Sequence, residues 1–241
     1  MDKHTLFKVV GGSHMAGLAT ENSDLDTYTV VAYEPNFYMG LPGHSGRPKQ
    51  KVTGEGADKS DETEFELRHF VGMCVKGNPT HLRLLWGSDA DYLECSSVGE
   101  MLRQRRHRFS ARSAGQPFVG MATGYFQRAK ARVGLEVYPD VTSAKELSNA
   151  FLLLHQVCEF MQNGILPVFM DYSVVRDLRR VREGKYTMAE SSEKFLTLRR
   201  RADSAVAASM LPAEVDTAYA DWMCVHALSA AWREMGVTLG F

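Results

Sequence analysis

The feature that most constrains this chain is a glycine turn between two strand-like stretches near the amino terminus. An apolar run over residues 6–10 leads into Gly11 and Gly12, and a β-rich run covers residues 24–31. The two glycines allow a tight turn, and Ser13 after them can open a helix whose free N–H groups face an anion such as phosphate. Glycine turns also occur with a purely structural role, so the turn alone leaves both interpretations open.

Two carboxylates, Asp24 and Asp26, stand one residue apart at the start of the second strand-like run. Strand alternation places both on one face, with backbone positions roughly 6 to 7 Å apart. This spacing suits the binding of one divalent cation or a pair of them. The alternative is a solvent-facing turn in which both acids are hydrated or Asp24 caps a backbone group, because two like charges repel each other without a metal.

A third carboxylate is expected on a neighbouring strand, because phosphoryl transfer on two Mg²⁺ ions commonly uses a further acid near the incoming hydroxyl. Asp61 is the candidate, since it opens a segment in which alternation up to Phe65 passes into helix-like spacing. Glu62 and Glu64 compete for the same role. Each of these acids is otherwise a solvated surface charge, which is the usual place of an acidic side chain.

The order of β-rich and helix-like runs predicts an α+β fold, with a small mixed β-sheet core followed by a helical carboxy-terminal domain. Residues 145–162 have apolar side chains at the three-and-four spacing of an amphipathic helix. Three later runs have similar helical patterns. They cover residues 174–183, 189–208 and 214–235.

We predict that the chain divides into three parts. Residues 1–95 form the core that contains the sheet, residues 96–115 a basic connecting segment, and residues 116–241 a helical domain. Residues 35–60 contain many Gly and Pro and few large apolar side chains. They are predicted to form one long loop, which is either a mobile lid or a partly disordered insertion.

The chain carries almost no net charge, since 28 Lys and Arg face 29 Asp and Glu. This balance excludes a wholly basic nucleic-acid coat protein, so any nucleic-acid contact must come from a local patch. Residues 101–135 contain no acid and are the candidate patch. Their basic side chains are Arg103, Arg105, Arg106, Arg108, Arg112, Arg128, Lys130 and Arg132. The block from Arg103 to Arg112 is either a contact surface for RNA phosphates or a solvated helix face.

The hydropathy pattern and the cysteines indicate in which cellular compartment the protein is expected. No apolar run approaches the roughly 18 residues that cross a bilayer, and the amino terminus lacks the layout of a secretory signal. We therefore expect a cytoplasmic protein without a membrane partner. The four cysteines are predicted to be buried free thiols, because they lack the paired spacing of zinc sites and disulfide frameworks. They are Cys74, Cys95, Cys158 and Cys224.

Tryptophans and histidines have less specific interpretations. Trp86, Trp222 and Trp232 are predicted to be core or interface residues rather than platforms for stacked bases. The histidines show no pair at metal-ligand spacing. His155 and His226, which lie in helical stretches, are therefore expected to serve in packing.

Together, Gly12-Ser13 and the later Asp24-x-Asp26 resemble the signature of the DNA polymerase β-type nucleotidyltransferase superfamily. The chain resembles more narrowly the predicted nucleotidyltransferases that include the RNA-ligase-associated polymerases. Matching pieces in the first part are Gly17-Leu18-Ala19-Thr20, Ser23-Asp24-x-Asp26, Tyr38-x-Gly40, Glu66-Leu67-Arg68-x-Phe70 and Gly77-Asn78-Pro79-Thr80. Later pieces are Arg108-Phe109-Ser110, Gly124-Tyr125 with Gln127, Asp177-Leu178 with Val181-Arg182-x-Gly184-x-Tyr186, and Leu211-Pro212 with Asp216.

The resemblance implies that Gly12 and Ser13 contact a nucleoside triphosphate such as ATP. It likewise implies that Asp24 and Asp26 bind Mg²⁺, with Mn²⁺ as the alternative ion. Asp61 matches the third carboxylate, as both a catalytic residue and a metal ligand.

The resemblance reaches into the predicted helical domain as well. Lys145 matches a family lysine that we assign to nucleotide binding. Three positions depart from the family pattern. Arg83 stands where a Glu is expected, and Asn149 and Leu152 stand where a His and an Arg are expected.

These observations predict a nucleotidyltransferase that moves a nucleoside monophosphate to an acceptor hydroxyl, with an RNA 3′ end as the preferred acceptor. Asp61 would orient and deprotonate that hydroxyl, and because a carboxylate with a pKa of about 4 is a poor base, a metal must lower the hydroxyl's pKa. Nucleotidylation of a small molecule or a protein side chain is one alternative, and near-neutral charge favours it. The other is a non-catalytic nucleotide-binding module, against which the three acids argue.

Overall fold

The computed structural model, which describes residues 2–21, 23–39, 49–53 and 60–237, has the predicted α+β fold. Its contacts form two compact units. A sheet unit comprises Met1–Val75, Thr80–Phe109 and Asp216–Phe241, and a helical unit comprises Lys76–Pro79 and Ser110–Val215. This division differs from the predicted one, because the segment before residue 110 and the carboxy-terminal segment both belong with the sheet.

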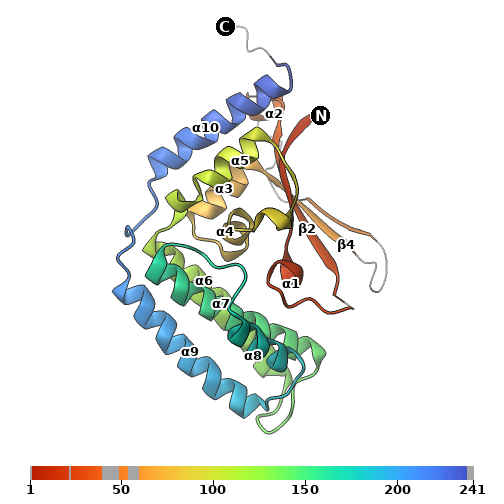
Figure 1. Ribbon diagram of the computed structural model, residues 1–241, viewed down its shortest axis with the longest axis vertical. Coiled ribbons are helices and arrows are strands. Elements are labelled where there is room, and N and C mark those ends of the chain that lie inside the picture. Colours follow the sequence, from red (N-terminus) through yellow and green to blue (C-terminus); the bar gives the residue numbers. More distant parts are fainter. Residues whose placement is uncertain (1, 22, 40–48, 54–59, 238–241) are drawn as a thin grey trace. The chain divides into compact units, whose positions relative to one another are not determined.

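The sheet unit is built on a five-stranded mixed sheet with the strand order β3-β4-β2-β1-β5. Its neighbouring strands β2 and β4 lie side by side in Figure 1. The strands are β1 (Lys3–Val10), β2 (Leu25–Tyr33), β3 (Lys49–Thr53), β4 (Ser60–Glu66) and β5 (Tyr92–Cys95). Strands β2 and β4 are parallel, and the other neighbouring strands are antiparallel. The glycine turn and Asp24 therefore lie between β1 and β2, and Asp26 is the second residue of β2. The two strands pair along their whole length.

Helices pack on the face of the sheet that carries Phe7 and Phe65. The helices of this unit are α1 (Gly12–Met15), α2 (Pro35–Met39), α3 (Leu67–Val75), α4 (Pro79–Leu85), α5 (Ser97–Gln104) and α10 (Thr217–Glu234). Phe70 of α3 lies edge-on to Phe7, with ring centres 5.6 Å apart, and His81 of α4 lies 4.5 Å from the ring of Phe65. Such aromatic contacts contribute about 1 kcal/mol each beyond the burial of apolar area, so they fix these helices over the sheet.

Helix α10 belongs to the sheet unit, although the sequence pattern placed it in a separate helical domain. Asp216 caps it by accepting a hydrogen bond from the backbone N–H of Tyr219 at 3.0 Å. The buried indole of Trp232 donates to the carbonyl oxygen of Tyr33 at 2.7 Å. An amphipathic pattern shows that a helix has an apolar face, but not which surface covers that face, which is why the partner of α10 could not be predicted.

The predicted long loop over residues 35–60 contains regular structure. Residues Pro35–Met39 form α2, and Lys49–Thr53 form strand β3, which pairs antiparallel with β4. The prediction of one continuous loop is therefore wrong at these two segments. Residues 40–48 and 54–59, on which the lid prediction also rests, lie outside the described residues.

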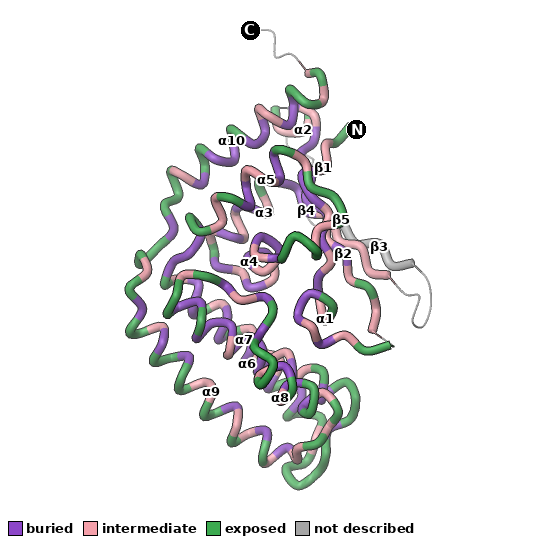
Figure 2. Tube along the Cα trace, in the orientation of Figure 1, coloured by how far each residue is buried: buried purple, intermediate pink, exposed green. Residues whose placement is uncertain are grey.

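The helical unit is organised around one buried helix, α7. Its helices are α6 (Gly115–Arg132), α7 (Val141–Asn163), α8 (Tyr172–Arg182) and α9 (Met188–Ala208), and α7 packs against each of the other three. Asp140 caps α7, and Gly164 ends it with a φ of 70°. Figure 2 shows α7 buried along most of its length. The helices predicted over residues 145–162, 174–183 and 189–208 are confirmed.

The four cysteines are free thiols, as predicted. Cys74, Cys158 and Cys224 are buried, but the prediction of burial is wrong for Cys95, which is exposed at the end of the edge strand β5. None of the described helices is long and apolar enough to span a bilayer.

Acidification is expected to destabilise both units through one histidine in each, the buried His81 and the half-buried His155. Burial is the main cause that lowers the pKa of His81 and of His155 to about 4. Unfolded chains bind a proton below pH of about 6.5, whereas the folded protein does not until about pH 4, so the free energy of unfolding falls by about 2 kcal/mol per histidine between pH 7.5 and pH 5. Urea unfolding at the two pH values should show a smaller decrease in His81→Phe than in the wild type. An equal decrease would contradict this account.

Candidate active site

The turn from β1 to α1 brings the backbone of Gly12 against the carboxylate of Asp26. Gly11 donates its backbone N–H to the carbonyl oxygen of Asp26 at 2.8 Å. Gly12 has a φ of 58°, and a Cβ at this position would lie 2.0 Å from Oδ2 of Asp26. A Cβ at Gly11 would lie 2.3 Å from the ring of Tyr28. Both glycines are therefore required by close approach, and the turn and the carboxylate form one site.

The structure places Asp26 and Asp61 side by side on neighbouring parallel strands. They are register partners in the β2–β4 pair, and neighbouring strands lie about 4.8 Å apart. Partners in register point to the same face of a sheet. Tyr28 lies two positions after Asp26, and Phe65 lies four positions after Asp61, so both rings belong to the same face as the acids. These rings are stacked, with centres 6.0 Å apart and planes 2° from parallel. The two carboxylates are therefore adjacent and on the helix-covered face.

Strand alternation sends Glu62 and Glu64 to the opposite face of β4. Lys8 donates to Glu62 at 2.7 Å. Glu64 forms an ion pair with Lys3 and accepts a hydrogen bond from the hydroxyl of Tyr33 at 2.6 Å. Both glutamates thus have partners away from Asp26, so Asp61 is the acid of this segment that shares its face.

Asp24 and Ser13 lie in the segment that links β1 to β2. Asp24 immediately precedes β2 and is half-buried. Helix α1 starts at Gly12 rather than at Ser13, and Ser13 is its second residue. Downstream, Ser23 ties the segment together by accepting a hydrogen bond from the backbone N–H of Thr20 at 2.9 Å.

Arg83 is a candidate site residue that the sequence did not reveal. It lies on α4, and its Nη2 donates to the carbonyl oxygen of Gly12 at 3.5 Å. This contact places a permanent positive charge beside the glycine turn, where a triphosphate carries negative charge. The only signal in the sequence was its departure from the family pattern, since an arginine stands where a glutamate was expected.

The chemistry of the donor set fits Mg²⁺, although the described residues contain no ready-made metal cluster. No group of three or more His, Cys, Asp or Glu side chains within the described ranges is close enough to hold an ion alone. Two adjacent carboxylates and Asp24 nearby offer hard oxygen ligands, and Mg²⁺ commonly uses one or two carboxylates together with substrate phosphates. The arrangement therefore suits an ion that arrives with a triphosphate.

Lys145 belongs to the helical unit. It lies near the start of α7 and is exposed. Its predicted role in nucleotide binding remains a prediction, and the five other predicted site residues, Gly12, Ser13, Asp24, Asp26 and Asp61, lie in the sheet unit.

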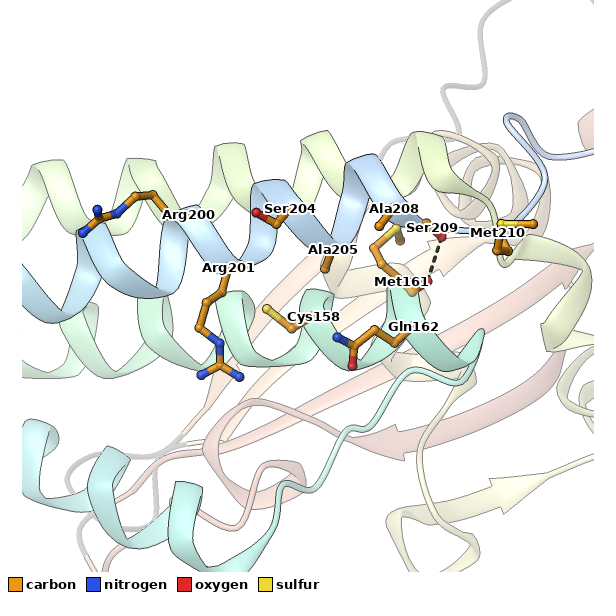
Figure 3. Close-up of a pocket in the computed structure, with 10 residues that line it drawn as sticks. All are labelled: Cys158, Met161, Gln162, Arg200, Arg201, Ser204, Ala205, Ala208, Ser209 and Met210. Carbon is orange, nitrogen blue, oxygen red and sulfur yellow. Dashed lines mark hydrogen bonds between the residues drawn. The ribbon is translucent and has the colours of Figure 1, made fainter.

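Cavities in the helical unit are lined by other residues. One of about 610 Å³ runs between α7 and α9, where Ser209 donates to the carbonyl oxygen of Met161 at 2.7 Å (Figure 3). A second of about 480 Å³ is lined in part by Asp177, which accepts hydrogen bonds from Tyr186 and Lys194. Neither cavity includes a predicted site residue.

The basic block differs from its prediction at Arg103. This guanidinium is buried, forms ion pairs with Asp89 at 2.6 Å and Glu100 at 2.8 Å, and covers the ring of Tyr92 at 3.8 Å. Arg103 is therefore a structural residue and no contact for phosphate. Acids outside the acid-free stretch supply its partners. Arg128 and Arg132 also have an acidic partner from outside this stretch, since both form ion pairs with Glu146.

Gly12→Ala is expected to weaken triphosphate binding by at least about tenfold and to destabilise the fold by about 1 to 3 kcal/mol, because a methyl group meets Asp26 and φ is positive. Gly72→Ala is the matched control. Gly72 lies within α3, and a Cβ there meets no atom within 4 Å, so this change should leave binding intact and stabilise the helix slightly. Calorimetry and urea unfolding measure both effects. Equal behaviour of the two variants would remove the argument for a closely packed turn.

Comparison with known families agrees with this geometry. A family model described as RlaP, the RNA repair pathway DNA polymerase beta family, matches residues 2–167. No curated protein matches the chain. The match covers more than half of the chain, including the glycine turn, the three carboxylates and Lys145. The chain therefore belongs to the RNA repair pathway DNA polymerase beta family, a group of polymerase β-type nucleotidyltransferases.

Proposed function

We propose that this protein transfers a nucleoside monophosphate from a nucleoside triphosphate to the 3′ hydroxyl of an RNA strand, in a reaction that requires Mg²⁺ or Mn²⁺. The observation that carries the proposal is the register pairing of Asp26 with Asp61 beside the Gly12 turn. This arrangement combines carboxylate oxygens for a cation with a closely approaching backbone for a triphosphate.

Each group has a separate task. Gly12 and Ser13 receive the triphosphate, and Arg83 balances part of its charge. Asp24, Asp26 and Asp61 would hold the metal. When bound, the metal neutralises phosphate oxygens and lowers the pKa of the attacking hydroxyl. The nucleotide-binding role of Lys145 stays a prediction from the family resemblance.

Asp61 is proposed to orient the acceptor and take its proton. The acceptor oxygen forms a bond to the α-phosphorus as the bond from that phosphorus to the pyrophosphate oxygen breaks, and pyrophosphate leaves. The proton of the hydroxyl passes to the carboxylate of Asp61 and from there to solvent. Asp61 suits this task because it comes from β4, whereas Asp26 comes from β2 beside the turn.

RNA is the proposed acceptor because the family is described as one of RNA repair and because exposed cations remain in the basic block. Arg108 and Arg112 are exposed, and Arg105 and Arg106 are half-buried. These residues can contact phosphates without breaking the ion pairs of Arg103.

The deciding experiment incubates the purified protein with each α-labelled triphosphate, with Mg²⁺, Mn²⁺ or EDTA, and with an RNA that ends in a 3′ hydroxyl. Matched reactions contain the same RNA with a 3′ phosphate, a mixture of small metabolites, or unrelated protein. Label should appear in the first RNA alone, and only with a divalent ion. Transfer to metabolites or protein would replace RNA as the acceptor, and no transfer to any acceptor would favour a non-catalytic module.

A further inference from the structure

Helix α10 carries a row of neighbouring rings, tilted by 31° and 34° to one another, on a side that does not face the sheet. The rings of Tyr219 and Trp222 have centres 5.4 Å apart, and those of Trp222 and His226 lie 3.9 Å apart. The guanidinium of Arg108 covers the outer end at 4.7 Å from the ring centre of Tyr219. We call these four residues the aromatic row.

The aromatic row is not part of the core. Trp222 retains 43% of its surface exposed, whereas Trp232 further along the same helix retains 8% and is hydrogen-bonded to Tyr33. The buried side of α10 is a different one, since it carries Met223 and Ala227, both fully buried. Packing within the sheet unit therefore does not account for the row. Of the two places predicted for Trp222, core or interface, the core is ruled out by this exposure.

Local hydrogen bonds hold the row in place. His226 bonds through its Nδ1 to the carbonyl oxygen of Trp222 at 2.8 Å, which keeps the imidazole over the indole. The backbone N–H of Tyr219 donates a hydrogen bond to the carboxylate of Asp216, which caps the start of the helix. The side-chain bond of His226 and the contacts between neighbouring rings restrict the side chains before any ligand binds, which lowers the entropic cost of binding.

The charge next to the row is positive at its Arg108 end. Arg105 lies at the end of α5, and Arg106 places its guanidinium 4.8 Å from the ring centre of Trp86. Both residues and Arg108 come from one short segment of the basic block. Asp221, on α10 itself, is the exposed acid nearest in sequence to Trp222. A ligand with flat groups and a negatively charged chain matches this combination of exposed rings and cations.

We propose that the aromatic row binds single-stranded RNA by stacking its bases on Trp222 and Tyr219, with Arg108 and its neighbours contacting the phosphates. Single strands bind in this way when aromatic platforms lie beside basic side chains, and stacking requires no particular base sequence. The inference rests on the proposed function in one respect, namely that the strand bound here is the acceptor. None of the four residues is among the site residues, so the row holds nucleotides other than the reacting one.

The test is a binding titration of an unstructured twelve-nucleotide RNA in EDTA without triphosphate, followed by tryptophan fluorescence. Of the three tryptophans, Trp222 is the most exposed, so stacking should quench its emission, and a duplex of the same sequence should not. Trp222→Ala is expected to weaken binding by about tenfold or more, and Trp222→Phe by less. Tyr172→Ala removes an exposed ring of the helical unit and should change the affinity by less than about twofold.

The logarithm of the RNA affinity falls linearly with the logarithm of the salt concentration. Arg108→Gln should make this decrease less steep, by about 0.7 in the slope. Thermal unfolding of every variant verifies that an exposed substitution leaves the fold intact. Unchanged RNA affinity in both Trp222→Ala and Arg108→Gln would overturn the proposal. So would concentration-dependent self-association that Trp222→Ala abolishes, because the row would then be an interface between copies.

A second readout separates this proposal from the proposed function. Transfer to a dinucleotide, which is too short to reach beyond the reacting end, should be equal in the wild type and Trp222→Ala, while transfer to the twelve-nucleotide RNA should show a higher KM in the variant. Equal KM values for the long RNA would overturn the aromatic row as an RNA site and leave the proposed function standing. If no RNA accepts label while Trp222-dependent binding persists, the proposed function fails and the binding surface remains.

Discussion

Asp26→Asn is expected to reduce nucleotidyl transfer at least about a hundredfold while leaving the metal-free protein folded. Asparagine keeps the size of the side chain and removes the charge that binds a divalent ion. The lost interaction stabilises mainly the transition state, and a hundredfold decrease corresponds to about 2.7 kcal/mol. Asp24→Asn should behave in the same way, because we assign it to the same metal. Initial rates at saturating triphosphate, with Mg²⁺ and with Mn²⁺, measure the effect.

Stability distinguishes a metal ligand from a structural residue in this variant. Asp26 lies next to Asp61 in register, and two like charges at this spacing repel each other without a metal. Neutralising one should leave the free energy of unfolding in EDTA unchanged or slightly higher. The backbone bond from Gly11 to the carbonyl oxygen of Asp26 does not depend on the side chain. An Asp26→Asn protein that unfolds, or one that retains near-normal transfer, would show that the carboxylate belongs to a structural turn.

Local pattern sufficed to predict the elements of the site, because its parts are close together in sequence. The strand before the glycine turn, the strand that follows Asp24 and the helix that follows Phe65 appear in the structure as β1, β2 and α3, in the expected order. What the sequence left open was which acid of β4 faces Asp26. That choice depends on strand register, which a single strand does not specify, and the pairing of Asp26 with Asp61 decides it.

Contacts between distant segments account for the features that the sequence did not predict. Arg103 seemed available to phosphate because its own stretch contains no acid, yet Asp89 lies fourteen positions away and binds it. Arg83 reaches Gly12 across seventy-one positions. Trp232 of α10 donates to the carbonyl oxygen of Tyr33, which lies one hundred and ninety-nine positions earlier in the chain. Composition and periodicity describe neighbours along the chain, so they carry no information on such pairs.

Asp61→Asn is expected to separate triphosphate binding from transfer. Because Asp61 is proposed to act on the acceptor side, the variant should bind triphosphate with an affinity within about threefold of the wild type and lose at least about a hundredfold in transfer rate. Calorimetry gives the affinity and single-turnover kinetics the rate. Asp26→Asn, by contrast, should also weaken the binding of the metal-bound triphosphate. The two variants should therefore differ in triphosphate affinity, although both lose transfer activity.

Glu62→Gln is the matched control, because Glu62 is the next residue of the same strand but faces the other side, where it binds Lys8 at 2.7 Å. The pair is partly exposed, so breaking it should cost no more than about 1 kcal/mol of stability and leave transfer intact. A general disturbance of β4 would instead reduce transfer in both variants. If Glu62→Gln abolishes transfer and Asp61→Asn does not, the catalytic acid lies on the opposite face, and the register argument for the site is wrong.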